Sequence, residues 1–386
     1  MPNPMRKLRL WLLVMLLSLS GLVVFFSPIN VHEWVFVYYM SYDNDLNPYG
    51  KVILRDLKNG VVNSKIAVVV QADFTDNKGM KRIAMYHANG KTHKKEIILK
   101  SEDSADEVEL KKYLGWVCKK YPAKNYAIIF LDHGGRLNQM CLDEKPFKNH
   151  NENKRFGSGK WLHASEAGKI VANFNQKVDG KVRLLFLQQC GRAVIQNLYN
   201  FVGAAEYIMA SPVKVDAPNT YYTKTLASVA QDPNITGEIL SKIIMKEDEH
   251  YTVYSLISNK ELKILPGKLK PVLQSFGLVA SLNRPKSCSH LFEFDGEKFY
   301  DLKFYFQSLN SSNNNIAGNE LNRFFDWYEN HLVVSKALRK PKSPDEFFYS
   351  GLSIFVPSSQ NDIAVYSFLP LYQQTSLERT MKLMFK

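Results

Sequence analysis

Residues 128–135 read IIFLDHGG, and residues 184–191 read LLFLQQCG. Each stretch runs from apolar, strand-type residues into a reactive side chain, His133 or Cys190, that is followed directly by glycine. In an open parallel sheet, ligands bind in the crevice at the carboxyl ends of the strands. If the two strands are neighbours, His133 and Cys190 face one crevice although 57 positions separate them in the chain.

Short apolar runs alternate with longer amphipathic runs from Trp34 onward, which is typical of crossover units that build a mainly parallel sheet. The expected strands are 34–40, 65–71, 81–86, 126–131, 182–187, 207–210 and 352–356, with 251–257 as a weaker eighth. The expected helices between them are 106–120, with Ser104 as its possible N-cap, 164–176 and 193–201. The sequence therefore predicts an α/β fold.

The later third of the chain has a mainly helical pattern. Its expected helices are 238–245, 269–282, 301–309 and 321–338, with a polar turn at 310–315. There is no internal repeat and no Gly/Ser linker, so this part is expected to pack on the sheet. We expect a leader over 1–30, a catalytic domain over 31–235, and a mostly helical region over 236–386 that contributes at least one further strand.

The composition describes a folded chain with a basic surface. The 386 residues are 45% hydrophobic, and the formal net charge is +13, which excludes a disordered chain and makes an anionic partner worth testing. The basic residues are scattered, without zinc-finger spacing or an RRM-type aromatic motif. We therefore expect no nucleic-acid partner. A membrane-tethered structural or nucleic-acid-binding protein that acts through its charge is a weaker alternative.

The first thirty residues have the features of a targeting segment. Arg6, Lys7 and Arg9 precede residues 10–26, a run that contains no charged residue. Its length falls between that of a signal peptide and that of a short membrane anchor. In both cases the positive flank predicts export of the following chain to the periplasmic or extracellular face, either anchored or secreted. A buried N-terminal helix is the alternative.

Metal ligands and disulfides are not indicated. The chain has four widely spaced cysteines and no CxxC pair, and its nine histidines show no HxxxH spacing. Asp43 and Asp45 form a short acidic turn that is compatible with calcium but favours a helix cap. We expect no metal site and no cofactor, with a calcium requirement left open.

Cysteine and histidine are the pair that nucleophilic catalysis needs. A thiol with a pKa near 8.5 is mostly protonated at neutral pH, and an adjacent imidazole can take that proton. Gly134 has no Cβ, so a substrate carbonyl can approach its N–H, which with that of Cys190 would form an oxyanion hole. A third, orienting residue is not identifiable, because Asp132 follows the strand on the opposite face from His133.

These residues resemble the clostripain-like cysteine peptidases of the caspase, gingipain and legumain clan. The resemblance rests on DHGG at 132–135 and QQCG at 188–191, and extends to VFVYYMSYDND at 35–45, EYIMASP at 206–212 and GLSIFVP at 351–357. It covers roughly residues 34–357 and implies a caspase-like αβα sandwich with a mainly parallel central sheet. It also implies a peptide or protein substrate, and it leaves the oligomeric state open.

Carried over to this chain, the resemblance implies that Cys190 is the nucleophile, His133 the general acid/base, and the Gly134 backbone an oxyanion donor. Family members usually have an aspartate on the floor of the S1 pocket, where this chain has Gln188. A neutral amide forfeits much of the charge-assisted binding of a basic P1 side chain. Asp216, in the loop after 206–212, is the acid that could restore it.

Two further features leave alternatives open. Gln189 replaces a usually small residue, so its side chain must fit a packed layer or point into the crevice.

Residues 145–160 are polar and read as a loop. Family members are often matured by cleavage in this interval, and Lys154 and Arg155 are the candidate sites. An ordinary surface loop is the alternative. Gln188 and Gln189 also keep open an inactive caspase-fold protein that binds peptides or partners at a membrane surface.

Overall fold

The computed structural model describes residues 31–386 except 76–78, 101–102, 145–158, 286–287 and 340–348. The leader prediction for 1–30 and most of the predicted 145–160 loop lie outside the described residues. Residues His32–Lys386 form one compact unit, and the division at residue 235 stays a prediction. Among the described helices, none combines the length and the apolar character needed to cross a membrane.

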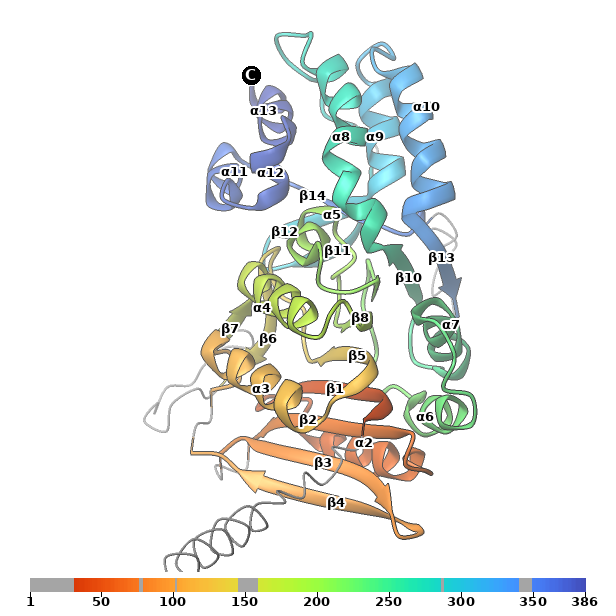
Figure 1. Cartoon of the computed structure of the whole chain (residues 1–386). Helices are drawn as coiled ribbons and strands as arrows, with labels where there is room; N and C mark the ends of the chain where they lie inside the picture. The colour runs from red at the N-terminus through yellow and green to blue at the C-terminus, as the bar shows by residue number, and fades with distance from the viewer. Residues whose placement is uncertain (1–30, 76–78, 101–102, 145–158, 286–287, 340–348) are drawn as a thin grey trace, which may run out of the picture. The chain divides into compact units, whose positions relative to one another are not determined.

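A nine-stranded mixed sheet forms the centre of this unit (Figure 1). Its five middle strands are parallel, as predicted, and the strands at both edges are antiparallel. The order is β13 (Val333–Leu338), β10 (Val253–Ser258), β9 (Tyr207–Ala210), β8 (Val182–Gln188), β5 (Ala123–Leu131), β1 (His32–Tyr42), β2 (Ile66–Phe74), β3 (Lys81–Ala88) and β4 (Lys91–Ile98). Crossover connections thus align the carboxyl ends of β1, β2, β5, β8 and β9 at one edge.

Both faces of the sheet are covered by helices because the buried strands are apolar on both sides. In β1, Val35, Val37 and Tyr39 belong to one core and Trp34 and Phe36 to the other. The first core includes α3 (Glu107–Lys120) and α4 (Ala164–Lys177), and the second includes α2 (Asn47–Gly60), α6 (Tyr222–Gln231) and α7 (Gly237–Glu247). The predicted αβα sandwich is confirmed.

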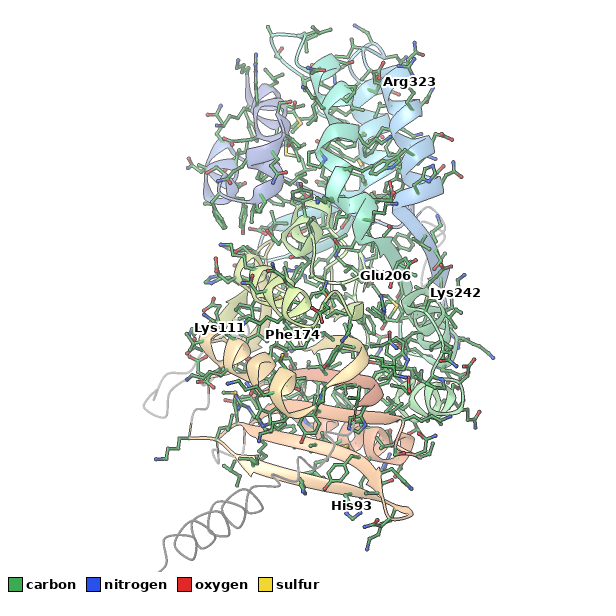
Figure 2. All side chains as sticks on the ribbon, in the orientation of Figure 1. His93, Lys111, Phe174, Glu206, Lys242 and Arg323 are labelled. Carbon is green, nitrogen blue, oxygen red and sulfur yellow. The ribbon has the colours of Figure 1, made fainter. Side chains whose placement is uncertain are left out.

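The helices are amphipathic, with apolar side chains toward the sheet and charges toward solvent. Phe174 of α4 is buried and packs edge-on against Tyr126 of β5, with ring centroids 5.4 Å apart. Lys111 of α3, Lys242 of α7 and Arg323 are exposed (Figure 2). These basic side chains are the solvated outer faces of helices, in agreement with the scattered charge of the sequence.

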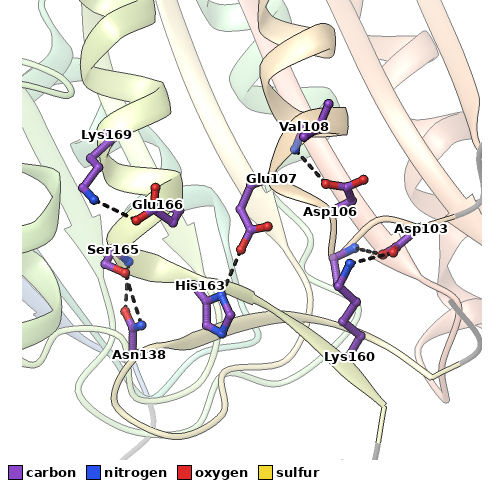
Figure 3. Close-up of polar contacts among 11 residues, drawn as sticks. Asp103, Asp106, Glu107, Val108, Asn138, Lys160, His163, Ser165, Glu166 and Lys169 are labelled. Atoms are coloured by element: carbon purple, nitrogen blue, oxygen red, sulfur yellow. Dashed lines mark hydrogen bonds and ion pairs between the residues drawn. The ribbon is translucent and has the colours of Figure 1, made fainter. Parts of the chain in front are cut away.

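A hairpin of β6 (Gln139–Asp143) and β7 (Lys160–His163) follows the His133 segment and is tied to α3 and to the loop that precedes α3. His163 Nδ1 contacts Glu107 at 2.9 Å, and Lys160 pairs with Asp103 at 2.7 Å (Figure 3). Asp106 caps α3 by accepting the Val108 N–H. The prediction of Ser104 as the cap was wrong, because its N–H donates to the buried carboxylate of Asp143.

The later part of the chain is mostly helical, as predicted. It also has elements that were not predicted, at 290–294, 297–301, 360–366, 370–374 and 377–382, and three predicted elements differ in pairing or extent. The helices are α8 (Asn259–Phe276), α9 (Leu302–Ser311), α10 (Gly318–Trp327), α11 (Gln360–Tyr366), α12 (Pro370–Gln374) and α13 (Leu377–Lys382). The predicted strand at 352–356 is β14 (Ser353–Val356), which pairs outside the central sheet with β12 (Glu297–Asp301), itself paired with β11 (His290–Phe294).

The other two differences concern helix limits. The helix predicted over 321–338 is shorter: α10 ends at Trp327, a π-helical turn continues it over Tyr328–Leu332, and 333–338 is the edge strand β13, which pairs with β10. The helix predicted from 269 begins ten residues earlier, at Asn259, where Ser258 caps it by accepting the Glu261 N–H. Two prolines inside α8, Pro266 and Pro271, conceal the helical period in the sequence.

Candidate active site

The two strand ends that carry His133 and Cys190 are neighbours in the sheet. β5 and β8 pair in parallel, and Leu131 is the register partner of Gln188. His133 lies two residues after Leu131, and Cys190 lies two residues after Gln188. Both residues therefore emerge side by side at the carboxyl edge of the sheet. They line one cavity of about 290 Å³, together with Gln188, Asp216 and further residues of segments 42–49 and 215–219. The structure thus brings four predicted site residues together.

Cys190 lies on a tight turn between β8 and α5 (Ile195–Leu198). Gly191 follows it with φ +62°, and a Cβ added there would lie 2.3 Å from the ring of Phe292. Glycine is therefore required at this position, both for the backbone conformation and for the space. This turn presents the half-buried Cys190 side chain to the cavity.

The Cys190 thiol contacts the backbone of the neighbouring loop. Its Sγ lies 3.4 Å from the Val215 nitrogen and 3.7 Å from the Val215 oxygen. Burial raises the pKa of this thiol, and the Val215 backbone, Arg192 and Lys214 offset that effect only in part. In the structure as it stands, the protonated thiol is the favoured form.

His133 is held by a carboxylate that the sequence analysis did not assign to the site. Its Nε2 lies 2.6 Å from Oδ1 of Asp45, which follows β1 at the same edge of the sheet. The main-chain oxygen of His133 accepts hydrogen bonds from the Cys141 N–H at 3.3 Å and from Gln189 Nε2 at 3.0 Å. Both the ring and the backbone of His133 are therefore positioned by hydrogen bonds.

The expectation that Asp45 belongs to a helix cap was wrong. Leu46 is the N-cap residue of α2 and has no side-chain cap hydrogen bond, and Asn44 rather than an aspartate accepts the Leu46 N–H. The signal available in the sequence was weak. Asp45 follows the apolar run of β1 much as His133 follows that of β5, so the carboxyl-edge argument applied to it equally.

The buried carboxyl of Asp132 holds the His133 segment in place, and the backbone N–H of His133 is one of its hydrogen-bond donors. The carboxyl also accepts the Asn44 Nδ2 at 2.8 Å and the Leu142 N–H. Burial raises the pKa of Asp132 well above its ordinary value. Asp132 therefore ties the β1 and β6 ends to the His133 segment.

Gly134 packs directly against the Cys190 turn. A Cβ at Gly134 would lie 2.0 Å from the carbonyl oxygen of Cys190, so no side chain fits there. Gly134 forms an isolated bridge with Met140, and the two hydrogen bonds of that bridge belong to Gly135 and Cys141. The Gly134 N–H is thereby directed away from β6. The described residues that line the cavity include His133 and Cys190 but not Gly134.

Gln188 is buried at the end of β8 within a polar network. Its Nε2 donates to Asn219 Oδ1 and to the Tyr222 hydroxyl, and its Oε1 accepts the Tyr221 hydroxyl at 2.6 Å. Asn219, which also lines the cavity, donates in turn to the buried Asp248 at 2.7 Å. Asn219 and Asp248 were not predicted from the sequence, because neither lies in a motif.

Asp216 and Gln189 occupy different positions relative to the cavity. Asp216 is exposed and lies on the loop that passes Cys190. Gln189 is almost fully buried yet belongs to the cavity lining. Its Nε2 bonds to the His133 oxygen and to Cys141 Sγ, whereas its Oε1 has no hydrogen-bond partner among the described residues. Gln189 therefore couples the Cys190 turn to the His133 segment.

A fully buried arginine makes a second connection between the two segments. Arg192 donates to the carbonyl oxygen of Cys190 at 3.1 Å, and to those of Gly135 at 2.6 Å and Gln139 at 2.5 Å. Burial lowers the pKa of Arg192 to about 10, so the guanidinium stays charged at neutral pH. Arg192 also donates to the carbonyl oxygen of Arg136, at 3.0 Å. These four hydrogen bonds fix the position of the Cys190 turn relative to the His133 segment.

The other groups considered in the sequence do not form a metal or disulfide site. Within the described part of the chain, no group of three or more His, Cys, Asp or Glu side chains has an arrangement that could hold a metal ion. All four cysteines, Cys118, Cys141, Cys190 and Cys288, are free.

Comparison with solved structures shows the same fold in proteases. An inactive zymogen of a C11 protease from Parabacteroides distasonis superposes with a TM-score of 0.65 at 17% identity, covering 89% of this chain and 98% of that one. A secreted C11 cysteine protease from Bacteroides thetaiotaomicron, in complex with an irreversible peptide inhibitor, gives 0.65 at 16% identity, covering 89% and 99%. At these identities, the likeness concerns the fold alone.

Comparison with sequence families is more direct. No curated protein sequence matches the chain significantly. The model of the clostripain family, Peptidase_C11, matches residues 38–367, which include both strand ends, the cavity and most of the helical part. The resemblance drawn from DHGG and QQCG is thereby confirmed, and the chain belongs to the clostripain family of cysteine peptidases.

Proposed function

We propose that the protein is a cysteine endopeptidase in which Cys190 is the nucleophile and His133 the general acid/base. The observation that carries this proposal is the position of both side chains in one cavity, on turns that Arg192 and Gln189 hold together. Family membership supplies the reaction class. The two side chains provide the groups that thiol-based amide hydrolysis needs.

The reaction follows from these groups. His133 takes the thiol proton, and the Cys190 sulfur attacks the scissile carbonyl carbon. The carbonyl oxygen becomes an oxyanion, for which the backbone N–H groups of Gly134 and Cys190 are the proposed donors. The C–N bond then breaks, and His133 returns its proton to the leaving amine. Water, activated by His133, hydrolyses the acyl-enzyme and regenerates the thiol.

Asp45 defines which ring nitrogen transfers the proton. Because Asp45 engages Nε2 at 2.6 Å, we assign proton transfer to Nδ1. A carboxylate on the far side of the ring also stabilises the imidazolium that forms during attack. The Cys190 thiol is protonated before substrate binds. It loses its proton to His133 when the substrate is bound, so the nucleophile is activated during binding.

The P1 preference is proposed to be basic. Asp45, Asp132 and Asp216 all contribute to the cavity lining; Asp45 and Asp216 are exposed, and Asp45 is bonded to His133. A cationic P1 side chain that enters beside Cys190 passes Asp216 and reaches the Gln188 floor. Carboxylates bind ammonium and guanidinium groups by charge-assisted hydrogen bonds.

Three further proposals rest on the sequence. Residues 1–30 direct the chain across a membrane and, if they are retained, 10–26 attach it there; the secreted relative from Bacteroides thetaiotaomicron supports export. Cleavage at Lys154 or Arg155 accompanies maturation, if the basic preference holds. The dyad carries out the hydrolysis without a cofactor, so activity is expected to persist in a chelator of calcium.

The test is hydrolysis of fluorogenic peptides that differ only at P1, by residues 31–386, before and after limited proteolysis. Cleavage is expected after Lys or Arg, and Cys190→Ala should abolish it, whereas Cys288→Ala should not. Asp216→Asn should lower kcat/KM for basic P1 residues about tenfold and leave uncharged ones unchanged. Folded protein that binds these peptides but cleaves none of them would instead be a peptide-binding pseudo-enzyme.

A further inference from the structure

Asp248 is a buried carboxylate behind the floor of the cavity. It follows α7 and is fully buried. Oδ1 accepts the N–H groups of Thr220 at 3.1 Å and His250 at 3.2 Å, and Oδ2 accepts the Tyr254 hydroxyl at 3.1 Å. These donors to the carboxylate are neutral; the guanidinium of Arg339 bonds instead to the main-chain oxygen of Asp248, at 2.9 Å.

The carboxylate of Asp248 determines the orientation of the amide in front of it. A carboxylate accepts hydrogen bonds, so the Asn219 atom 2.7 Å from Oδ2 must be the donor nitrogen Nδ2. Nδ2 also donates to the Tyr254 hydroxyl at 3.0 Å. With its nitrogen facing Asp248, Asn219 turns its oxygen toward Gln188.

The same reasoning fixes Gln188. Since Asn219 presents its oxygen, the Gln188 atom bonded to it must be the nitrogen Nε2, and Nε2 donates in addition to Tyr222. The Gln188 oxygen then faces the Tyr221 hydroxyl, which donates to it at 2.6 Å. Asp248, Asn219 and Gln188 therefore form a chain of aligned dipoles, in which each carbonyl points away from the carboxylate.

This alignment decides what the cavity floor offers a ligand. Both hydrogens of the Gln188 amide are occupied, and so are those of Asn219. Any hydrogen bond that Gln188 or Asn219 makes to a ligand must therefore use a carbonyl oxygen, which has a second lone pair. A floor with acceptors only, backed by a negative charge, favours a P1 side chain that donates hydrogen bonds and carries positive charge.

We propose that Asp248 is a specificity-determining residue that acts through Asn219 and Gln188 to select a lysine or arginine side chain at P1. The proposal rests on the proposed function, in which this cavity receives P1. It explains how the chain keeps a cation-selective pocket with a glutamine where an acid would be expected. Asp248 acts through the two amides, without contact to the substrate.

The test compares the binding of two peptides that are identical except for P1, lysine in one and its uncharged isostere norleucine in the other. Affinities are measured by calorimetry in the Cys190→Ala background, so that no turnover is needed. Asp248→Asn and Gln188→Met are made in that background. Asp301→Asn is the matched control, because Asp301 is a buried carboxylate that accepts the N–H groups of Phe304 and Ser350 and lies outside the cavity lining.

The Cys190→Ala protein should prefer the lysine peptide. Asp248→Asn and Gln188→Met should each reduce the lysine-to-norleucine affinity ratio about tenfold, whereas Asp301→Asn should not change it. Because the ratio is taken within one preparation, partial misfolding of a variant does not alter it. An unchanged ratio in Asp248→Asn or in Gln188→Met, or no lysine preference in the Cys190→Ala parent, overturns the proposal. Hydrolysis of the same peptides by the protein with Cys190 intact is assayed in parallel. A lysine preference in binding without any hydrolysis would contradict the proposed endopeptidase function and leave the role of Asp248 standing.

Discussion

The imidazole of His133 and the carboxylate of Asp45 lie 2.6 Å apart, Nε2 to Oδ1, although 88 positions separate them in the chain. Asp45 follows β1 and His133 follows β5, and these strands are parallel neighbours in the sheet. The relationship gives the histidine a fixed orientation beside Cys190. Its consequences can be measured, because Asp45 is largely exposed and replacing it should leave the fold intact.

Replacement of Asp45 is expected to lower kcat in a graded way. Asparagine keeps an acceptor oxygen and loses the charge, whereas alanine loses both. We expect kcat to fall about tenfold in Asp45→Asn and about a hundredfold in Asp45→Ala, with KM nearly constant, because orientation and imidazolium stabilisation act on the reacting state. Steady-state kinetics on a P1-lysine peptide checks this. Equal kcat in all three proteins would exclude a positioning role for Asp45.

The thiol of Cys190 should react slowly at neutral pH in the absence of substrate. Because burial raises its pKa above the ordinary 9.0, the thiolate is scarce at pH 7 and its fraction still increases beyond pH 9. Alkylation by iodoacetamide, followed by mass spectrometry at Cys190, should therefore accelerate with pH without reaching a plateau at pH 9. A rate that is already constant from pH 7 upward would show a preformed thiolate.

Gly191 and Gly203 can be compared to measure how tightly the Cys190 turn is packed. Both have positive φ, +62° and +82°, but a Cβ meets Phe292 at 2.3 Å in the first and nothing within 4 Å in the second. We expect Gly203→Ala to cost about 1 kcal/mol of unfolding free energy and Gly191→Ala about 3 kcal/mol or more. Urea denaturation measures both. If both variants lose the same unfolding free energy, the Phe292 ring moves to make room for the added Cβ, and the Cys190 turn is not tightly packed.

Asp73 should make stability depend on pH. It lies at the end of β2 near Asp43 and Asp143, and burial together with these carboxylates raises its pKa from 3.8 to about 9. Between these values the unfolded chain has lost a proton that the folded protein keeps, so the free energy of unfolding falls as pH rises, by about 1.4 kcal/mol per unit at most.

The matching variant is Asp73→Asn, which cannot ionise. The melting temperature of the variant minus that of the parent protein should be larger at pH 8 than at pH 4.5. Only the parent is destabilised as pH rises, because its Asp73 carboxyl stays protonated in the folded state and ionises in the unfolded chain. Scanning calorimetry at the two pH values makes the comparison. A difference that is constant with pH, or one that reverses, would show that Asp73 is ionised in the folded protein.

The central sheet and the glycine-flanked turn at Cys190 could be predicted from local sequence because their signals are local. The β5 and β8 runs are apolar on both faces, as parallel strands covered by helices must be. β4 was missed because its sequence, KTHKKEII, is largely exposed at the edge of the sheet and lacks an apolar run. The β6 and β7 strands are short, and their pairing depends on residues far apart in the chain.

The partners of the site were hidden for a related reason. Asp45, Asn219 and Asp248 reach it through tertiary contacts between separate loops, and no motif connects them in the sequence. Gln188 was predicted to be the position where the pocket differs from the family pattern, and the structure places it in the cavity lining. What the sequence could not supply was the direction of its amide, which follows only from the bonds to its neighbours.

The identity of the nucleophile is tested most directly by covalent trapping. Residues 31–386 are treated with an irreversible peptidyl acyloxymethyl ketone that carries lysine at P1, and the modified residue is mapped by peptide mass spectrometry. Cys118, Cys141 and Cys288 act as internal controls, since all are free thiols. The account predicts one adduct, on Cys190, that blocks hydrolysis completely. An adduct on another cysteine, or hydrolysis that persists after Cys190 is fully modified, would contradict it.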